Sequence, residues 1–459
     1  MKKLLFLILL LLPIFGQVEY SFSDNFQITD SSGNQKFPEV IINNDIIHLT
    51  WVNVYGNTKN IMYARSEDFG ENFSVPIQVN YLNNNIIAYG QSGSKIETFN
   101  DNIFITYIDD RNGSWSVYLN VSYDNGLTWQ EEIMISDTSY LNGYQDFEVD
   151  GDGNLHLIYY NYAANNHLED VRYRFAETGN DDWAFNPSMP LGIVTDQMEP
   201  CDCCQPDLEI NENGDVYVAY RNNLQNYRDT YLAVKRFNES DFPENYQVSN
   251  FQDYIPYCPS SGPVIDIHNN QIAVAYTVYD NEKVYTSISN LDEIDFANFI
   301  NIYPESNSKQ NYPYLSLDEN MLVVWSDYIN SNNGNWEVYF GIRDLETDSM
   351  LNIQKINDDG ANYIQKDPII YKYINDAYIF WSDQRNGNYE IYFSKGTPQS
   401  NILGDINQDF VLNVLDVIEL VQVVLGYSDN INNADLNEDN IINVQDVIIL
   451  VNWILNSSF

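Results

Sequence analysis

A repeating β-strand unit is the feature that most constrains the fold of this chain. Each copy contains alternating apolar runs separated by turns rich in Asn, Asp and Gly, and the copies recur about every 50 to 60 residues. Met321–Trp325 followed by Trp336–Phe340 is one example, and Ala377–Trp381 followed by Tyr389–Phe393 is another. β-Branched and aromatic residues in such runs favour strands. Seven copies begin near Pro38, Ser92, Asp146, Pro206, Pro263, Pro313 and Pro368.

This period predicts the four-stranded blades of a β-propeller. Seven copies imply seven blades, or six blades if one weak copy is an insertion. The last copy supplies only three strands before Gly396, so we expect residues 25–29 to add the missing outer strand. Joining both ends of the chain in one blade would close the ring and remove open sheet edges.

Two copies carry a further turn motif, Ser-x-Asp-x-Gly-x-x-aromatic. It spans Ser66–Phe73 in one copy and Ser122–Trp129 in the other. The Asp is expected to accept turn N–H bonds, the Gly to take a positive-φ position, and the aromatic ring to pack the turn onto its blade. This motif is the Asp box, and residues 18–396 resemble the sialidase-like (BNR-repeat) propellers. The boxes indicate fold and not activity.

A sialidase of that family needs three arginines on the substrate carboxylate, a Tyr nucleophile activated by a Glu, and an acid–base Asp. The family's early Arg-Ile-Pro motif is absent here. The catalytic residues therefore stay unknown, and the weak candidates are Arg221, Arg228 and Asp229, which follow the cysteine cluster. The competing interpretation is that these three residues form ordinary ion pairs.

All four cysteines lie in two places, Cys201, Cys203 and Cys204 before one blade and Cys258 before the next. In an exported protein an even number of cysteines predicts disulfides. One arrangement pairs Cys258 with a member of the cluster and leaves the other two joined locally. A soft-metal or redox site and free thiols are the alternatives. Disulfides here would hold adjacent loops together over one end of the propeller's central channel.

The C-terminal region contains two twelve-residue loops with oxygen-bearing side chains at positions 1, 3, 5, 9 and 12. The second loop begins 30 residues after the first. A backbone carbonyl at position 7 would complete the oxygen ligands that Ca²⁺ requires. The sequence therefore predicts two calcium sites, the alternative being polar Asx turns. Their ligands would be Asp405, Asn407, Asp409, Val411, Asn413 and Asp416, and Asp435, Asn437, Asp439, Ile441, Asn443 and Asp446.

Each loop is followed by apolar residues at helical spacing, which predicts a loop–helix pair that is duplicated. This duplication resembles the type I dockerin module, which implies a cohesin-like domain or cell-surface scaffold as partner. Two features depart from that family. Loop position 6, normally Gly, is Phe410 or Asn440, and a Phe there would weaken the first site. Positions 10 and 11 are the apolar pair Val414-Leu415 in the first loop, which puts the partner in doubt.

The N-terminus and the overall charge predict an exported protein. Two lysines, an apolar run from Leu4 to Phe15 and Gly16 predict a secretory signal peptide over residues 1–16. That run is too short to span a membrane, so we do not expect an integral membrane protein. The formal net charge of −45 argues against nucleic-acid partners.

The sequence thus predicts a mainly β protein with a small C-terminal all-α domain. The expected domains are a signal peptide at 1–16, a propeller at 17–398 and a dockerin-like domain at 402–459. The leading hypothesis is a secreted or cell-surface protein whose propeller recognises a glycan or glycoprotein. A glycoside hydrolase acting on polysaccharide or glycan is one alternative, and a non-enzymatic structural adhesion protein is another.

Overall fold

The computed structural model describes most of the chain. The described residues are 19–81, 85–88, 91–138, 141–162, 168–178, 183–191, 200–329, 335–360, 363–399, 403–407, 412–427, 433–437, 439 and 441–456. The predicted signal peptide, Asp409, Phe410, Val411 and Asn440 lie outside them. Two compact units are present, Phe22–Gly396 and a second that includes the described residues from Thr397 onward.

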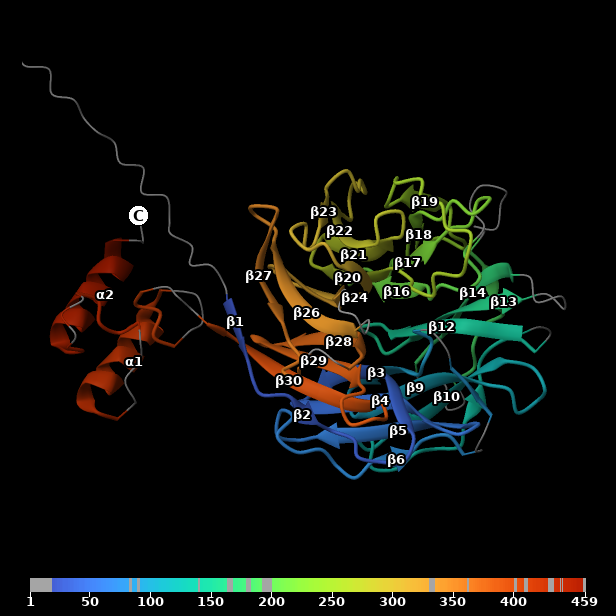
Figure 1. Ribbon diagram of the computed structural model, residues 1–459, viewed down its shortest axis with the longest axis horizontal. Coiled ribbons are helices and arrows are strands. Elements are labelled where there is room, and N and C mark those ends of the chain that lie inside the picture. The colour runs from blue at the N-terminus through green and yellow to red at the C-terminus, as the bar shows by residue number, and fades with distance from the viewer. Residues whose placement is uncertain are drawn as a thin grey trace, which may run out of the picture. The chain divides into compact units, whose positions relative to one another are not determined.

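The described residues of the first unit form seven antiparallel sheets, which follow one another around a ring in chain order (Figure 1). Each sheet is one blade, and the propeller is seven-bladed as predicted; the six-bladed alternative is wrong. The first four blades comprise β3 (Asn34–Asn43), β4 (Ile46–Tyr55), β5 (Thr58–Ser66) and β6 (Ile77–Gln78); β7 (Ile86–Ile87), β8 (Lys95–Phe99), β9 (Asn102–Asp109), β10 (Ser116–Ser122) and β11 (Ile133–Met134); β12 (Leu141–Val149), β13 (Leu155–Tyr162), β14 (Leu168–Ala176) and β15 (Met189–Pro190); and β16 (Asp207–Ile210), β17 (Val216–Arg221), β18 (Thr230–Lys235) and β19 (Glu244–Gln247).

The last three blades complete the ring. They comprise β20 (Val264–His268), β21 (Gln271–Val278), β22 (Lys283–Asn290) and β23 (Phe299–Asn301); β24 (Lys309–Leu317), β25 (Met321–Ile329), β26 (Asn335–Asp344) and β27 (Ser349–Lys355); and β28 (Gln365–Tyr373), β29 (Asp376–Asp383), β30 (Glu390–Gln399), β1 (Glu19–Phe22) and β2 (Phe26–Gln27).

Closure of the ring uses both ends of the propeller segment. Strands β1 and β2 pair with β30, and Phe26 lies opposite Phe393. The expectation that residues 25–29 supply an outer strand to the last blade is therefore confirmed. This arrangement pairs a strand edge that would otherwise be open.

The hydrophobic core lies between neighbouring blades. Trp51 and Leu49 of the first blade, for example, share a buried cluster with Phe380 and Tyr378 of the last. The large rings that recur on the second strand of each repeat fill these interfaces, and Trp51, Trp325 and Trp381 are almost wholly buried. Burial of aromatic area of this kind is the main stabilising contribution in such a fold.

Both Asp boxes have the predicted geometry. The Gly126 amide donates to Ser122 Oγ at 2.8 Å, and the Thr128 amide donates to Asp124 Oδ1 at 2.8 Å. Gly126 has φ 80°, and the Trp129 ring packs edge-on to Tyr63. The Asp, Gly and aromatic positions of the motif thus hold a turn against its blade.

The second unit contains two helices, α1 (Val414–Leu425) and α2 (Val444–Asn456). Asn413 caps α1 by accepting from the Leu415 amide, and Gly426 ends the helix with φ 74°. The two helices share a small buried cluster that includes Leu420 and Leu450. Within the described ranges, no helix is both long and apolar enough to cross a membrane.

Candidate functional site

The inner strand of each blade places two side chains on the central channel. Residues two apart in a strand point to the same side, so each inner strand contributes one residue near its start and a second further down. The first set, here the upper ring, is Glu39, Lys95, Asp146, Asp207, Val264, Tyr314 and Ile369. The second set, here the lower ring, is Ile41, Glu97, Glu148, Glu209, Asp266, Ser316 and Tyr371.

A β-bulge recurs within four of these inner strands, just before the upper-ring residue. The pairing register of the inner strand shifts just before Glu39, Asp146, Tyr314 and Ile369. A bulge bends a strand and redirects the side chain that follows it. In the first and last of these blades, Pro38 and Pro368 occupy the bulged segment, which explains why proline marks the starts of several repeats.

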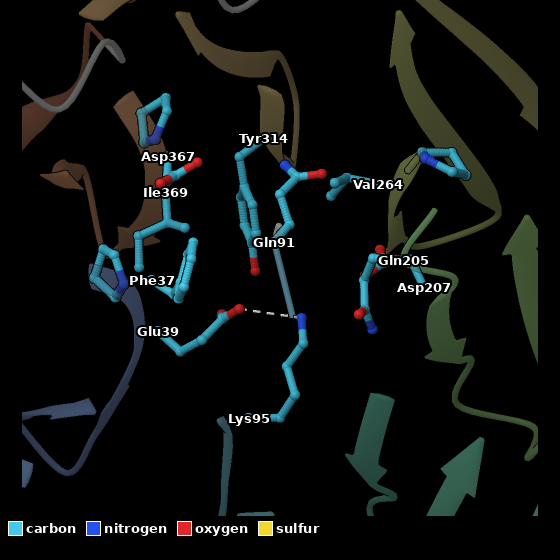
Figure 2. A pocket seen from close by; sticks show the side chains of 13 residues that line it. Phe37, Glu39, Gln91, Lys95, Gln205, Asp207, Val264, Tyr314, Asp367 and Ile369 are labelled. Carbon is cyan, nitrogen blue, oxygen red and sulfur yellow. Dashed lines mark ion pairs between the residues drawn. The ribbon is translucent and has the colours of Figure 1, made fainter. Parts of the chain in front are cut away.

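A pocket opens where the inner strands begin, and we call it the mouth pocket. Its volume is about 40 Å³. A larger channel cavity of about 350 Å³ is lined by the lower ring and by five members of the upper ring, Glu39, Lys95, Asp146, Asp207 and Tyr314. Figure 2 shows the Tyr314 side chain directed toward the ion pair between Lys95 and Glu39. The polar residues that line the mouth pocket are Glu39, Gln91, Lys95, Gln205, Asp207, Tyr314 and Asp367.

Lys95 is the centre of a buried charge network. Its Nζ lies 3.1 Å from a Glu39 oxygen and 3.3 Å from an Asp146 oxygen. Burial alone would lower the pKa of Lys95, but the Asp146 and Glu39 carboxylates raise it well above its ordinary value. Burial raises the pKa of Glu39, and Lys95 opposes this rise. The lysine therefore stays charged and holds two carboxylates side by side at the mouth.

Three channel carboxylates also join neighbouring blades. Asp146 Oδ2 accepts from the Leu208 amide, Asp207 Oδ2 from the Ile265 amide, and Asp266 Oδ2 from the Leu317 amide, each at 2.7 Å. Each bond runs from one inner strand to the next, so these carboxylates have a structural role in addition to their charge.

The lower ring is strongly acidic. Burial raises the pKa of Glu97 to about 8, with Asp146 adding to the rise, and burial raises the pKa of Asp266 to about 7. Burial and neighbouring carboxylates, Glu97 and Asp266 among them, also raise the pKa values of Glu148 and Glu209. Part of the ring is therefore protonated at neutral pH.

Tyr314 is suited to donate a hydrogen bond at the mouth pocket. Burial raises the pKa of its phenol well above the ordinary value, Glu39 adds to this, and Lys95 opposes it. The phenol therefore stays protonated and can donate a hydrogen bond, but it is a weak acid and, while protonated, a weak nucleophile.

Arg221, Arg228 and Asp229 are not among the residues that line the mouth pocket. Arg221 is buried and donates to the Arg228 and Thr277 carbonyls at 2.9 and 2.8 Å. Asp229 accepts from the Phe251 and Gln252 amides, at 3.0 and 3.2 Å. Asp229 thus holds the loop that precedes β20, and Arg228 reaches the loop that precedes β16 through Cys201.

The cysteines belong to the same pair of loops. Cys203 and Cys258 form a disulfide, so the expectation that Cys258 pairs with the cluster is supported. Cys201 and Cys204 are buried and unbonded, and their Sγ atoms lie 3.0 Å apart. Arg228 donates to Cys201 Sγ at 2.9 Å. Hydrogen bonding to Cys204 lowers the pKa of Cys201 to about 7 against the effect of burial, with help from Arg228. The second predicted bridge stays a prediction.

The described parts of the two C-terminal loops have the same internal bonding. Asp416 Oδ1 accepts from the Ile406 amide at 2.8 Å and its Oδ2 from the Asn413 amide at 2.8 Å. Asp446 repeats this with the Leu436 and Asn443 amides, both at 2.8 Å. The position-12 carboxylate thus folds each loop back onto its own start.

The donor set of these loops suits a hard cation. Asp405, Asp416 and Asp446 are fully buried, although all three carry carboxylates. In the second loop the Asp439 amide donates to Asp435 Oδ1 at 3.1 Å, and Asn437 Nδ2 donates to Asp439 Oδ2 at 3.0 Å. The residues at positions 1, 3 and 5 of the second loop therefore lie close together, as the ligands of a calcium loop do.

Comparison with known proteins supports the fold and no closer relationship. No family model matches the sequence, and no curated protein matches it. Among solved structures, the chain is similar to an ulvan lyase, a polysaccharide lyase bound to -[GlcA(1-4)Rha3S]-, with TM-score 0.52 and 8% identity over 83% of this chain and 97% of that chain.

Two further structures are carbohydrate-active enzymes. Trypanosoma rangeli sialidase with the inhibitor DANA matches with TM-score 0.43 and 11% identity over 90% of this chain, and the match spans 63% of the sialidase chain. An α-L-arabinofuranosidase from Fusarium graminearum with an iminosugar inhibitor matches with TM-score 0.45 and 10% identity, over 82% of this chain and 97% of that chain. The protein is a seven-bladed β-propeller, and its fold resembles that of the polysaccharide lyase.

Sequence reasoning missed the mouth pocket and both rings. A signal was present: charged or polar residues recur two apart where strands of the repeat begin, as in Lys95 and Glu97, Asp146 and Glu148, and Asp207 and Glu209. In a buried inner strand such a pair must face a polar space, because unpaired charges are not buried in a core. Reading this pattern across the repeats would have identified the channel.

Proposed function

We propose that the propeller binds a glycan at the mouth pocket. The observation that carries this proposal is a pocket that combines two aromatic side chains, two amides and three carboxylates. They belong to Phe37 and Tyr314, to Gln91 and Gln205, and to Glu39, Asp207 and Asp367. Mixed aromatic and hydrogen-bonding surface suits a sugar ring, which is apolar on its faces and polar around its edge. The sialidase, polysaccharide lyase and arabinofuranosidase neighbours support the same ligand class.

Binding of the purified full chain to a glycan array tests this proposal. We expect a set of related glycans to bind the wild type and to bind Tyr314→Ala at least tenfold more weakly. Tyr427→Ala is the matched control, because Tyr427 is 81% exposed and lies in the C-terminal unit. Failure of every glycan to bind the wild type would contradict the proposal and favour a purely structural adhesion role.

Glycoside hydrolysis is a second candidate, favoured by the pairing of Glu39 and Asp146 on one ammonium beside a protonated Tyr314. A raised carboxyl pKa suits a general acid, and a second carboxylate suits a base or nucleophile. Arginine is absent from the residues that line either cavity, so the pocket does not offer the carboxylate clamp of a sialidase. Release of reducing sugar that Glu39→Gln abolishes would establish hydrolysis; binding without turnover would exclude it for that glycan.

For the C-terminal unit we propose two calcium sites, one in each loop. Asp405, Asn407, Asn413 and Asp416 would hold the first ion, together with Asp409 and the Val411 carbonyl, and Asp435, Asn437, Asp439, Asn443, Asp446 and the Ile441 carbonyl would hold the second. Bound calcium would fix the loops at the helix N-termini. Titration calorimetry of the full chain should show two binding events, and Asp435→Ala should remove one. A titration without heat would refute the assignment.

We further propose that this unit attaches the exported protein to a cohesin-like domain or cell-surface scaffold. Val414, Ile418, Val421 and Leu425 form an exposed apolar stripe along α1, and Val444, Ile448 and Leu455 repeat it on α2. Apolar stripes of this kind on a surface helix mark interaction sites. Calcium-dependent binding to a cohesin panel, lost in Ile418→Asp combined with Ile448→Asp, would support the attachment. Binding that is unchanged by both substitutions would contradict it.

A further inference from the structure

The mouth pocket is lined mainly by acidic side chains, and burial raises the pKa of each of them. Glu39, Asp207 and Asp367 line it, whereas Lys95 is its only cationic lining residue and is shared between Glu39 and Asp146. The acidic lower ring lies one layer deeper in the same channel. A carboxylate or sulfate on a bound sugar would therefore meet repulsion at this position.

The nearest additional cations are already engaged. Lys366 Nζ lies 3.9 Å from Asp367 Oδ2 and 5.7 Å from the centre of the Tyr389 ring. Lys36 lies over the same ring, at 4.5 Å. Neither lysine lines the mouth pocket, so they reduce the negative charge at Asp367 without presenting an ammonium to the ligand.

A buried hydrogen-bond acceptor without a donor indicates that the ligand supplies a hydrogen-bond donor. Gln205 is 6% exposed and lines the pocket, and its Oε1 has no hydrogen-bond partner. Its Nε2 donates to the Gln145 and Pro206 carbonyls, at 2.7 and 3.2 Å, which fixes the orientation of the amide. Asp367, 7% exposed, likewise has an Oδ2 without a hydrogen-bond donor. A buried acceptor that lacks a donor is destabilising, so a ligand that donates a hydrogen bond here is favoured.

We propose that the glycan bound at the mouth pocket carries a free amino group, as in oligosaccharides of 2-amino-2-deoxyglucose. This inference rests on the proposed glycan binding and specifies its chemical class. An ammonium brings three donors and a positive charge. Gln205 and Asp207, which lie side by side at one wall of the pocket (Figure 2), offer an amide oxygen and a carboxylate to it, and Asp367 adds a carboxylate at the opposite wall. The pocket volume of about 40 Å³ accommodates such a group in place of roughly three waters. An N-acetyl group would lose the charge and add bulk.

The test compares four tetrasaccharides with the full chain by titration calorimetry: a β-1,4-linked glucosamine oligomer, its N-acetylated form, a neutral glucose oligomer and a galacturonate oligomer. We expect the glucosamine oligomer to bind at least tenfold more tightly than the N-acetylated and neutral forms, with affinity falling as salt rises. The galacturonate oligomer should not bind. Asp367→Asn should weaken the glucosamine oligomer about tenfold and leave the neutral oligomer unchanged, because Asn tolerates the φ of 54° at this position.

The possible outcomes distinguish the amino-sugar inference from the proposal that the mouth pocket binds a glycan. Equal or tighter binding of the N-acetylated, neutral or uronate oligomer would overturn the amino-sugar inference while glycan binding stands. Binding of other array glycans, with none of these four, would also overturn the inference alone. A wild type that binds no array glycan would overturn both. Asp101→Asn, at an exposed position, is the control for a general charge effect.

Discussion

Glu97→Gln should stabilise the protein at alkaline pH and leave it almost unchanged at pH 5. The pKa of Glu97 is raised from 4.5 to about 8 by burial first, then by Asp146 and Glu39, against an opposing effect of Lys95. Glu148, which also belongs to the lower ring, interacts electrostatically with Glu97. Between these two pKa values the folded state holds a proton that the unfolded chain has released. The contribution of Glu97 to the free energy of unfolding is therefore fully present below about pH 4.5, and it is lost as the pH rises toward 8.

The magnitude follows from proton linkage. One bound proton changes the free energy of unfolding by up to about 1.4 kcal/mol per pH unit, so the wild type loses on the order of 3 kcal/mol from this site between pH 5 and 8. Glutamine fills the same volume and does not titrate, which removes this loss. Guanidinium unfolding of the full chain at pH 5, 6, 7 and 8 measures the difference, with Glu131→Gln at an exposed position as control. A difference between Glu97→Gln and wild type that does not change with pH would refute the reasoning.

Three further substitutions test the structural assignments. Lys95→Met should lower the free energy of unfolding by about 3–5 kcal/mol at pH 7, because Glu39 and Asp146 lose their buried cation; a loss under 1 kcal/mol by chemical unfolding would contradict the network. Cys258→Ser should cost about 2–5 kcal/mol in guanidinium unfolding by removing a link across 55 residues, and an unchanged midpoint would exclude the bridge. Gly126→Ala should cost about 3 kcal/mol in thermal unfolding, since its Cβ would lie 2.0 Å from Tyr63 Oη. Gly113→Ala, with φ +76° and open space around it, should cost only about 1–2 kcal/mol; equal losses would contradict the packing argument.

The blade count was accessible from sequence because each blade repeats the same local pattern. Alternating runs such as Met321–Trp325 define strands, and the Asp boxes at Ser66 and Ser122 define turns. The closing strand could be predicted as well, because the last copy ended one strand short. These features depend on neighbouring residues in the chain, which a sequence displays directly.

The mouth pocket could not be assembled in the same way. Glu39, Lys95, Asp207, Tyr314 and Asp367 come from five different blades, and only ring closure brings them together. Arg221 was a candidate site residue because it follows the cysteine cluster. Its guanidinium instead donates hydrogen bonds to backbone carbonyls of its own blade and the adjacent blade. The candidates chosen for their nearness in sequence therefore have a structural role. The residues of the charged pocket are far apart in sequence and meet only when the ring closes.

Hydrogen–deuterium exchange of the full chain with a bound oligosaccharide tests the central claim most directly. Glycan binding at the mouth pocket predicts protection of residues 36–39, 203–207, 262–264 and 366–369, where inner strands begin around the pocket. The Asp-box turns at 66–73 and 122–129 should exchange as in the free protein. Protection confined to those turns, or an exchange pattern that the ligand leaves unchanged, would contradict the account.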